Sequence, residues 1–133
     1  MMLCDTNIFI EMYRGNAYIA SVFEQIKRYS HIAVPDVVRA ELFFGAKNKN
    51  ELNFIRKDLN SFKILPILPE ISTIAVKLVE EYCLSHHLDF HDALIAATAI
   101  YHDVELYTLN VKDFIFIPGV KLYHPQEASS QSS

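Results

Sequence analysis

The residues best suited to chemistry in this chain are three acids, Asp5, Glu41 and Asp92, each beside an apolar segment. Asp5 follows the short apolar run at 2–4, and Asp92 directly precedes another at 93–97. Divalent cations such as Mg²⁺ bind through carboxylate oxygens, so acids that meet at one point predict a metal site. Each acid alone indicates little. If all three open or follow elements at the same edge of a sheet, they predict a cation site there.

Glu41 is the most informative of these acids by pattern alone. In a helix its neighbours one turn away are almost all apolar: Val37, Val38, Phe44 and Gly45. This places the carboxylate on the core-facing stripe, where burying an unpaired charge costs on the order of several kcal/mol. The carboxylate therefore needs a cation or a hydrogen-bond partner. An ion pair with Arg14, Arg39 or a lysine would satisfy it as well as a metal ion.

Helix capping competes with a chemical role for the other acids. Asp89 and Asp92 have the spacing of a capping box, with Asp89 at the N-cap and Asp92 at the third helical position. By spacing alone, capping is the favoured role for Asp92. Asn110 is similarly placed to cap a short helix with Asp113 in its first turn, and Asp36 is placed to cap the helix of Glu41.

The elements that would position these residues alternate along the chain. Apolar runs predict strands at 2–4, 31–34, 62–68, 105–108 and 120–123. Pro66 is expected to end the strand portion of the third run. Helical periodicity predicts helices at 8–12, 19–30, 37–45, 50–61, 71–83 and 89–101. This alternation indicates an α/β fold with helices on both faces of a mostly parallel five-stranded sheet. Sites in such sheets form beyond the carboxyl ends of the strands, where Asp5 and Asn110 would lie.

Length and composition indicate one globular domain. The chain has 133 residues, of which 51% are hydrophobic and 21% are charged, which suits a domain with its own core. No apolar run is long enough for a bilayer, and Asp5 interrupts what would be a signal peptide. Cys4 and Cys83 lack a paired metal spacing. We therefore expect a cytoplasmic protein, not bound to a membrane, with a domain at 1–125 and a flexible Ser-rich tail at 126–133.

Charge and motifs argue against several other classes of protein. A net charge of −4 disfavours binding to nucleic acid by charge alone. The chain contains neither Gly-x-Gly-x-x-Gly nor a P-loop, and Asn7 stands where a HAD-type phosphatase needs a second Asp. His87 and His91 are four residues apart, but they straddle a predicted helix boundary and residue 88 is not Glu, so a zinc pair is disfavoured.

Four blocks of the sequence, taken together, resemble those of PIN-domain ribonucleases. The blocks are Leu3-Cys4-Asp5-Thr6-Asn7, Ala40-Glu41-Leu42, Asp92-Ala93-Leu94-Ile95-Ala96-Ala97 and Tyr107-Thr108-Leu109-Asn110-Val111-Lys112-Asp113-Phe114. They occur in the family's order, and the resemblance extends through Pro125. The subgroup that the chain resembles most is the VapC-type toxins of bacterial toxin–antitoxin pairs.

The resemblance implies a PIN-like α/β/α sandwich and an endoribonuclease that depends on Mg²⁺ or Mn²⁺. The acidic triad of the family falls on Asp5, Glu41 and Asp92, which would bind the metal. The fourth catalytic position, acidic in some members, falls on Asn110, with Asp113 one helical turn further on. Polar residues near the first acid would orient it or contact substrate phosphate: Thr6, Asn7 and Thr108.

The resemblance also implies partners. RNA would be the substrate, a small antitoxin protein would block the active-site groove, and the chain would form a homodimer. The main alternative is a catalytically silent PIN-like module that only binds RNA or a protein. The intact acidic triad argues against that alternative.

Overall fold

Residues 1–125 are the part of the chain that this computed structural model describes, and they form five short strands and six α-helices. Two helices follow each of the first three strands. The strands are β1 (Met2–Cys4), β2 (Ile32–Pro35), β3 (Lys63–Leu65), β4 (Glu105–Tyr107) and β5 (Lys121–Leu122). The helices are α1 (Thr6–Tyr13), α2 (Ala17–Tyr29), α3 (Asp36–Phe44), α4 (Lys49–Leu59), α5 (Pro69–His86) and α6 (Phe90–His102), with a 3-10 turn, η1 (Val111–Asp113). The tail predicted at 126–133 lies outside the described residues.

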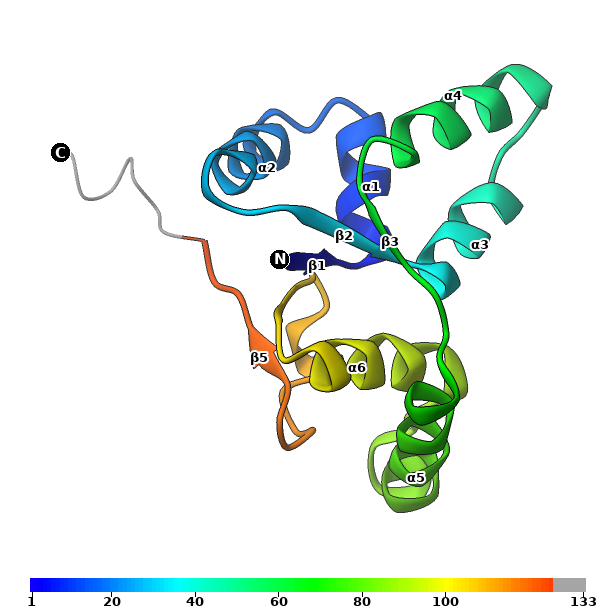
Figure 1. Cartoon of the computed structure of the whole chain (residues 1–133), viewed down its shortest axis with the longest axis vertical. Coiled ribbons are helices and arrows are strands. Elements are labelled where there is room, and N and C mark those ends of the chain that lie inside the picture. The colour runs from blue at the N-terminus through cyan, green and yellow to red at the C-terminus, as the bar shows by residue number, and fades with distance from the viewer. Residues whose placement is uncertain (126–133) are drawn as a thin grey trace, which may run out of the picture.

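The strands form one sheet in the order β3-β2-β1-β4-β5, and every neighbouring pair is parallel. β1 is central, since Met2 pairs with Ile32 of β2 and also with Glu105 of β4. Figure 1 shows α1 to α4 on one side of the sheet and α5 and α6 on the other. The predicted α/β/α sandwich with a five-stranded sheet is confirmed.

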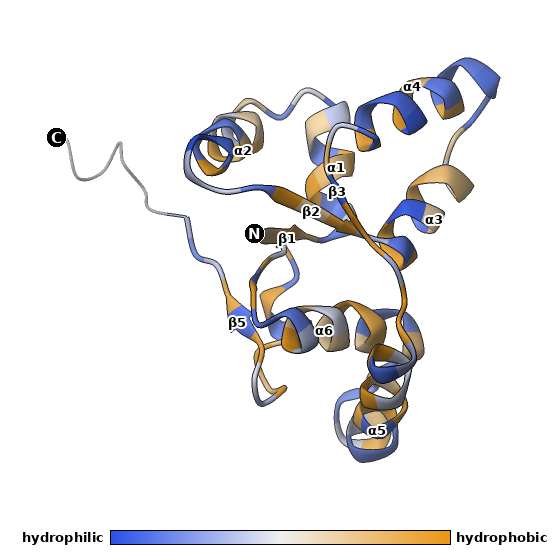
Figure 2. Cartoon of the chain, viewed as in Figure 1, coloured by the Kyte–Doolittle hydropathy of each residue, from blue (hydrophilic) through white to orange (hydrophobic). Residues whose placement is uncertain are grey.

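The core forms where the apolar strands meet the helices. Every residue of β1 and β2 is buried, as expected for central strands covered on both faces. Figure 2 shows these strands as hydrophobic, whereas much of α4 is hydrophilic. Phe9 of α1 is fully buried, and its ring centroid lies 5.8 Å from those of Phe23 and Phe62. This aromatic cluster fixes α1, and with it the residues at the start of α1, against the sheet.

The start of α3 differs from the sequence prediction. Asp36 is the first residue of the helix and does not cap it, since Pro35 of β2 occupies the N-cap position. The chain passes from β2 into α3 with no residue between them, so Asp36 already lies within the first turn. There its carboxylate accepts a hydrogen bond from Arg39 at 2.8 Å and lies close to the positive end of the helix dipole.

Both cysteines are free thiols in the structure. Cys4 is buried in β1, and Cys83 is half-buried on α5. Burial, with a smaller contribution from the charge of Asp5, raises the pKa of the Cys4 thiol. No helix in residues 1–125 combines the length and apolar character needed to span a membrane.

Candidate active site

The sheet has a switch point at β1, because β2 and β3 lie on one side of it and β4 and β5 on the other. Ligands of parallel sheets bind beyond the carboxyl ends of the strands at such a point. Asp5 follows β1 and Thr108 follows β4, and the Asp5 N–H donates to the Tyr107 carbonyl at 3.0 Å. Glu41 lies on α3, which starts at the carboxyl end of β2, and Asp92 lies in the first turn of α6.

Asp5 is a buried and firmly held carboxylate. It is the N-cap of α1, and its Oδ1 atom accepts the Thr6 N–H at 2.7 Å. Its Oδ2 atom accepts the Thr108 hydroxyl at 2.8 Å and the Asn7 side-chain amide at 3.4 Å. The residue is only 5% exposed. A carboxylate has about four acceptor sites, so Oδ1 retains one for a further ligand.

The pKa of Asp5 responds to the charges of the other two acids, which lie near it. Burial raises the pKa of Asp5 above its ordinary value of 3.8, while hydrogen bonds from Thr108 and Thr6 lower it. The negative charges of Asp92 and Glu41 raise it again. A cation bound among these carboxylates would therefore relieve repulsion that the metal-free protein carries.

The residues predicted to orient Asp5 form one hydrogen-bonded network around it. The Asn7 side-chain oxygen, Oδ1, accepts the Leu109 N–H at 3.2 Å, and the side-chain nitrogen, Nδ2, donates to Thr108 Oγ1 at 3.4 Å. Thr108 Oγ1 also accepts the Asn110 N–H at 3.0 Å. These bonds join the loop after β4 to the first turn of α1, although the two segments are about a hundred residues apart in the sequence.

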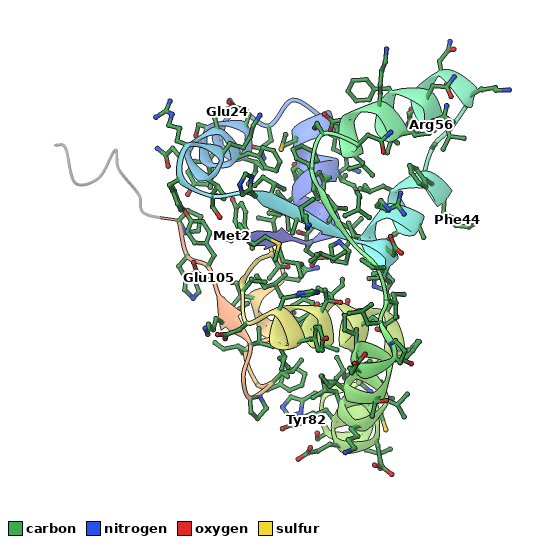
Figure 3. The ribbon with its side chains drawn as sticks, viewed as in Figure 1. Met2, Glu24, Phe44, Arg56, Tyr82 and Glu105 are labelled. Carbon is green, nitrogen blue, oxygen red and sulfur yellow. The ribbon has the colours of Figure 1, made fainter. Side chains whose placement is uncertain are left out.

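Glu41 is not on the buried face of α3, which corrects the sequence prediction. Val38 and Leu42 are the buried residues of this helix, whereas the Glu41 side chain is 44% exposed. The apolar neighbours do not mark a core face, since Phe44 is 93% exposed and projects away from the body of the molecule in Figure 3. Glu41 Oε1 instead accepts the Thr6 hydroxyl at 2.7 Å, which joins α3 to α1.

The arginines considered as partners for Glu41 pair with other acids. Arg14 lies 2.9 Å from a carboxylate oxygen of Glu11, and Arg39 lies 2.8 Å from one of Asp36. The two partners of each pair are three positions apart on one helix or helix end, where such contacts form locally. Glu41 is contacted instead by the Thr6 hydroxyl on α1 and by a residue of α6.

That residue is His91, which sequence reasoning considered only for zinc. His91 Nε2 is 2.6 Å from Glu41 Oε1, a close contact without the alignment of a hydrogen bond, and His91 Nδ1 is 3.5 Å from Asp92 Oδ1. The bond to Asp92 raises the pKa of His91 to about 9, with smaller contributions from the charges of Glu41 and Asp5, although burial lowers it. Its place directly before Asp92 was the only sequence signal for this role.

The donor set fits a hard divalent cation in its chemistry. Asp5, Glu41 and Asp92 offer only oxygen atoms, which are the ligands that Mg²⁺ and Mn²⁺ prefer. Asp5 is buried and fixed, whereas the side chains of Glu41 and Asp92 are 44% and 32% exposed and open to an entering ion. Within residues 1–125, no three potential ligand side chains already surround one point. The His91 ring lies between two of the acids.

The first turn of α6 is held by half of the predicted capping box. Asp89 is the N-cap, and its Oδ1 atom accepts the Asp92 N–H at 2.9 Å. The reciprocal bond from the Asp89 N–H to the Asp92 carboxylate is not formed in the described structure, and Asp92 faces His91 instead. Capping and a role in the site are therefore divided between the two acids.

Removing this cap should weaken α6. We expect Asp89→Ala to lower the free energy of unfolding by about 1 kcal/mol, because the Asp92 N–H loses its partner. Urea denaturation followed by circular dichroism measures this loss. Asn caps helices as well as Asp does, so Asp89→Asn should stay within a few tenths of a kcal/mol of the wild type. Equal losses in both variants would contradict a capping role.

The candidates for the fourth catalytic position, Asn110 and Asp113, lie at η1. Asn110 is exposed at the start of η1 and forms no side-chain cap bond, and Asp113 is half-buried in η1. Neither side chain forms a hydrogen bond or ion pair with the three acids in residues 1–125. Their roles in the site stay predictions.

Comparisons with known proteins identify the family. The model of the PIN domain family matches residues 2–115. This chain belongs to the PIN domain family. Ribonuclease VapC1 of Rickettsia felis is 34% identical to it, over 91% of this chain and 93% of that protein. Ribonuclease VapC19 of Mycobacterium tuberculosis is 33% identical, over 91% and 98%. The resemblance predicted from the four blocks is confirmed.

Solved structures agree with this assignment. A toxin–antitoxin complex from Klebsiella pneumoniae contains a chain that is 33% identical to this PIN domain, with a TM-score of 0.76. The match covers 96% of this PIN domain and 99% of that chain. The curated relatives place the PIN domain in the VapC group.

Proposed function

We propose that this PIN domain is the toxin of a toxin–antitoxin pair and acts as a divalent-metal-dependent endoribonuclease. The observation that carries the proposal is the position of Asp5, Glu41 and Asp92 at the switch point of the sheet, in a chain whose relatives are named ribonucleases. Asp5 lies on the buried side of this group and the other two acids on the solvent side. A polynucleotide can reach only the solvent side.

The three acids have different tasks in this proposal. Asp5 is the fixed ligand, because Thr6 and Thr108 hold its two oxygens in place. Glu41 and Asp92 are the exposed ligands that close on the ion from α3 and α6. Thr6 links Asp5 to Glu41, since its backbone N–H donates to Asp5 and its hydroxyl donates to Glu41. Positioning of this kind matters because small misplacement of reacting groups costs rate steeply.

When bound, Mg²⁺ or Mn²⁺ would supply a water of lowered pKa and neutralise charge on the phosphodiester. The chain supplies the carboxylates that fix the ion, and the Asn7–Thr108 network that keeps Asp5 in its rotamer. Asn110, exposed beside this network, is proposed as a contact to substrate phosphate or as the fourth ligand. Asp113 is the acidic alternative for that fourth position.

RNA cleavage by the purified chain tests the proposal. We expect a labelled RNA to be cut in Mg²⁺ or Mn²⁺ and to stay intact in excess EDTA, with cleavage restored when Mg²⁺ is returned. Cut ends identified by sequencing would show whether cleavage is internal. RNA that binds in a mobility-shift experiment but is never cut in either metal would instead support the silent binding module.

An antitoxin segment is the proposed occupant of a groove beside the site. A groove of about 430 Å³ lies between α1, α3 and α4 and reaches Glu41 at one end. Its walls combine apolar and charged groups: Ile10, Tyr13, Arg14, Glu41, Leu42, Gly45, Lys47, Glu51, Phe54 and Ile55. A partner seated there would cover one of the proposed metal ligands. The Klebsiella relative was solved as a toxin–antitoxin complex, which supports a partner of this kind.

A homodimer in the cytoplasm completes the proposal. Large apolar side chains on and near the α5–α6 side are exposed, including Leu84 at 92% and Ile115 at 66%, and a second copy would cover such surface. Free Cys4 and Cys83 suit a reducing compartment. Light scattering on the chain alone, and after co-expression with the product of the neighbouring reading frame, tests dimer and antitoxin together. A monomer that captures no such product would contradict both.

A further inference from the structure

The ring of His91 fills the space between the two exposed acids of the site. One ring nitrogen is 2.6 Å from Glu41 Oε1 on α3, and the other is 3.5 Å from Asp92 Oδ1 on α6. Glu41 Oε1 also accepts the Thr6 hydroxyl at 2.7 Å, so protein groups contact this oxygen from both α1 and α6. We propose that His91 is a latch, which occupies the metal site in the metal-free protein and must rotate away when a divalent cation binds.

The arrangement of the ligands carries this inference. Three carboxylates can surround one ion only if Glu41 and Asp92 both turn toward it, and each now faces the ring. Consistent with this, no three potential ligand side chains in the described part of the chain surround one point. The inference rests on the proposed function, because it takes Asp5, Glu41 and Asp92 as the metal ligands.

The latch can open without moving the backbone. The His91 side chain is 37% exposed, so solvent lies on one side of the ring and a rotation about the Cα–Cβ bond can carry it outward. Its backbone is fixed in the first turn of α6, which Asp89 caps. The bond from the Thr6 hydroxyl to Glu41 does not involve the ring, so rotation of His91 alone does not break this contact between α1 and α3. A side-chain rotation of this kind occurs within nanoseconds on an exposed surface.

Only molecules in which the His91 ring has rotated away can bind the ion, so the apparent affinity is the intrinsic affinity multiplied by the fraction of such molecules. A minor state populated at about 10% or less weakens the apparent affinity about tenfold or more. Removing the ring removes this competition. A ring nitrogen that bound the ion directly would have the opposite effect, because its loss would remove a ligand.

Binding of Mn²⁺ to the full chain tests the latch. Free Mn²⁺ is measured by electron paramagnetic resonance for the wild type, His91→Ala, Asp5→Asn and the control His31→Ala. His31 is an exposed histidine before β2, at the opposite edge of the sheet. We expect His91→Ala to bind Mn²⁺ about tenfold more tightly, His31→Ala to match the wild type, and Asp5→Asn to bind much more weakly.

The outcomes separate the latch from the proposed function. If the wild type binds Mn²⁺ and His91→Ala binds it equally or more weakly, the latch alone is overturned. Weaker binding by His91→Ala would identify His91 as a ligand of the ion. Tighter binding by His91→Ala with no RNA cleavage by the wild type keeps the latch and overturns the ribonuclease. If neither protein binds Mn²⁺, both proposals fall. A second readout follows the His91 ring by NMR, where Mg²⁺ should shift the ring signals of His91 and leave those of His31 unchanged.

Discussion

Replacing Asp5 with Asn should abolish RNA cleavage by this PIN domain while its fold stays intact. The substitution removes the one buried, fixed carboxylate of the proposed metal site. Loss of several kcal/mol of transition-state stabilisation corresponds to a fall in rate of about a thousandfold or more. Cleavage of labelled RNA under single-turnover conditions in Mg²⁺ measures the fall, and circular dichroism checks the fold. Full activity in this variant would eliminate the proposed site.

The fold should survive because Asn keeps the cap of α1. An Asn side chain accepts the Thr6 N–H as Asp does, and it caps helices equally well. The matched control is Asp103→Asn, an exposed acid at the other end of α6 that pairs with Lys121. Asn tolerates the left-handed backbone of residue 103, so this variant should retain both stability and cleavage.

The same substitution should change how stability depends on pH in EDTA. The pKa of Asp5 is raised in the folded protein, so the folded state binds more protons than the unfolded chain. The stability that protonated Asp5 contributes is fully present below its ordinary pKa of 3.8 and is lost as pH rises through the folded pKa. Asp5→Asn lacks this loss. Its free energy of unfolding relative to the wild type should therefore rise as the pH increases above 3.8, and a constant difference would contradict the raised pKa.

Phe9→Ala should cause the largest loss of stability, about 3–5 kcal/mol. Phe9 is fully buried and packs edge-on against Phe23, with Phe62 completing the cluster. Truncation leaves a cavity between α1, α2 and the start of β3, which the rigid sheet cannot fill. The whole domain is expected to have about 5–15 kcal/mol of stability, so this variant should lose much of it. Urea denaturation gives the difference in unfolding free energy.

Phe44→Ala is the control for Phe9→Ala because it removes the same atoms from an exposed position. Phe44 is 93% exposed on α3, so its loss should change the free energy of unfolding by less than about 0.5 kcal/mol. Similar losses for both variants would mean that the aromatic cluster does not organise the core.

The order and type of the elements could be predicted from the sequence because buried parallel strands are short apolar runs. β1 begins and ends where the run at 2–4 predicted it. β5 is shorter than the predicted 120–123, since it is an edge strand that pairs only with β4, and pairing partners cannot be read from one segment. The cap of α6 by Asp89 was also predictable, because capping depends on residues three positions apart.

The site could be predicted only where it depends on sequence position. Asp5 follows a strand, and its place at the sheet edge follows from that. The burial of Glu41 was predicted wrongly, because the apolar neighbours of a helix residue do not give the rotation of that helix against the sheet. The contact of His91 with Glu41 was not predictable either, since it crosses from α6 to α3 and depends on how both helices pack.

The central place of β1 has a consequence for the order of events during synthesis. β1 is made before the other four strands, yet one of its two partners in the sheet is β4, which begins about a hundred residues later. The Thr108 hydroxyl that holds Asp5 comes from beyond β4, at a separation of 103 residues. A chain still on the ribosome therefore cannot complete this site until β4 and Thr108 have emerged. Growing chains and early-terminated fragments carry the first acid but not the network that fixes it.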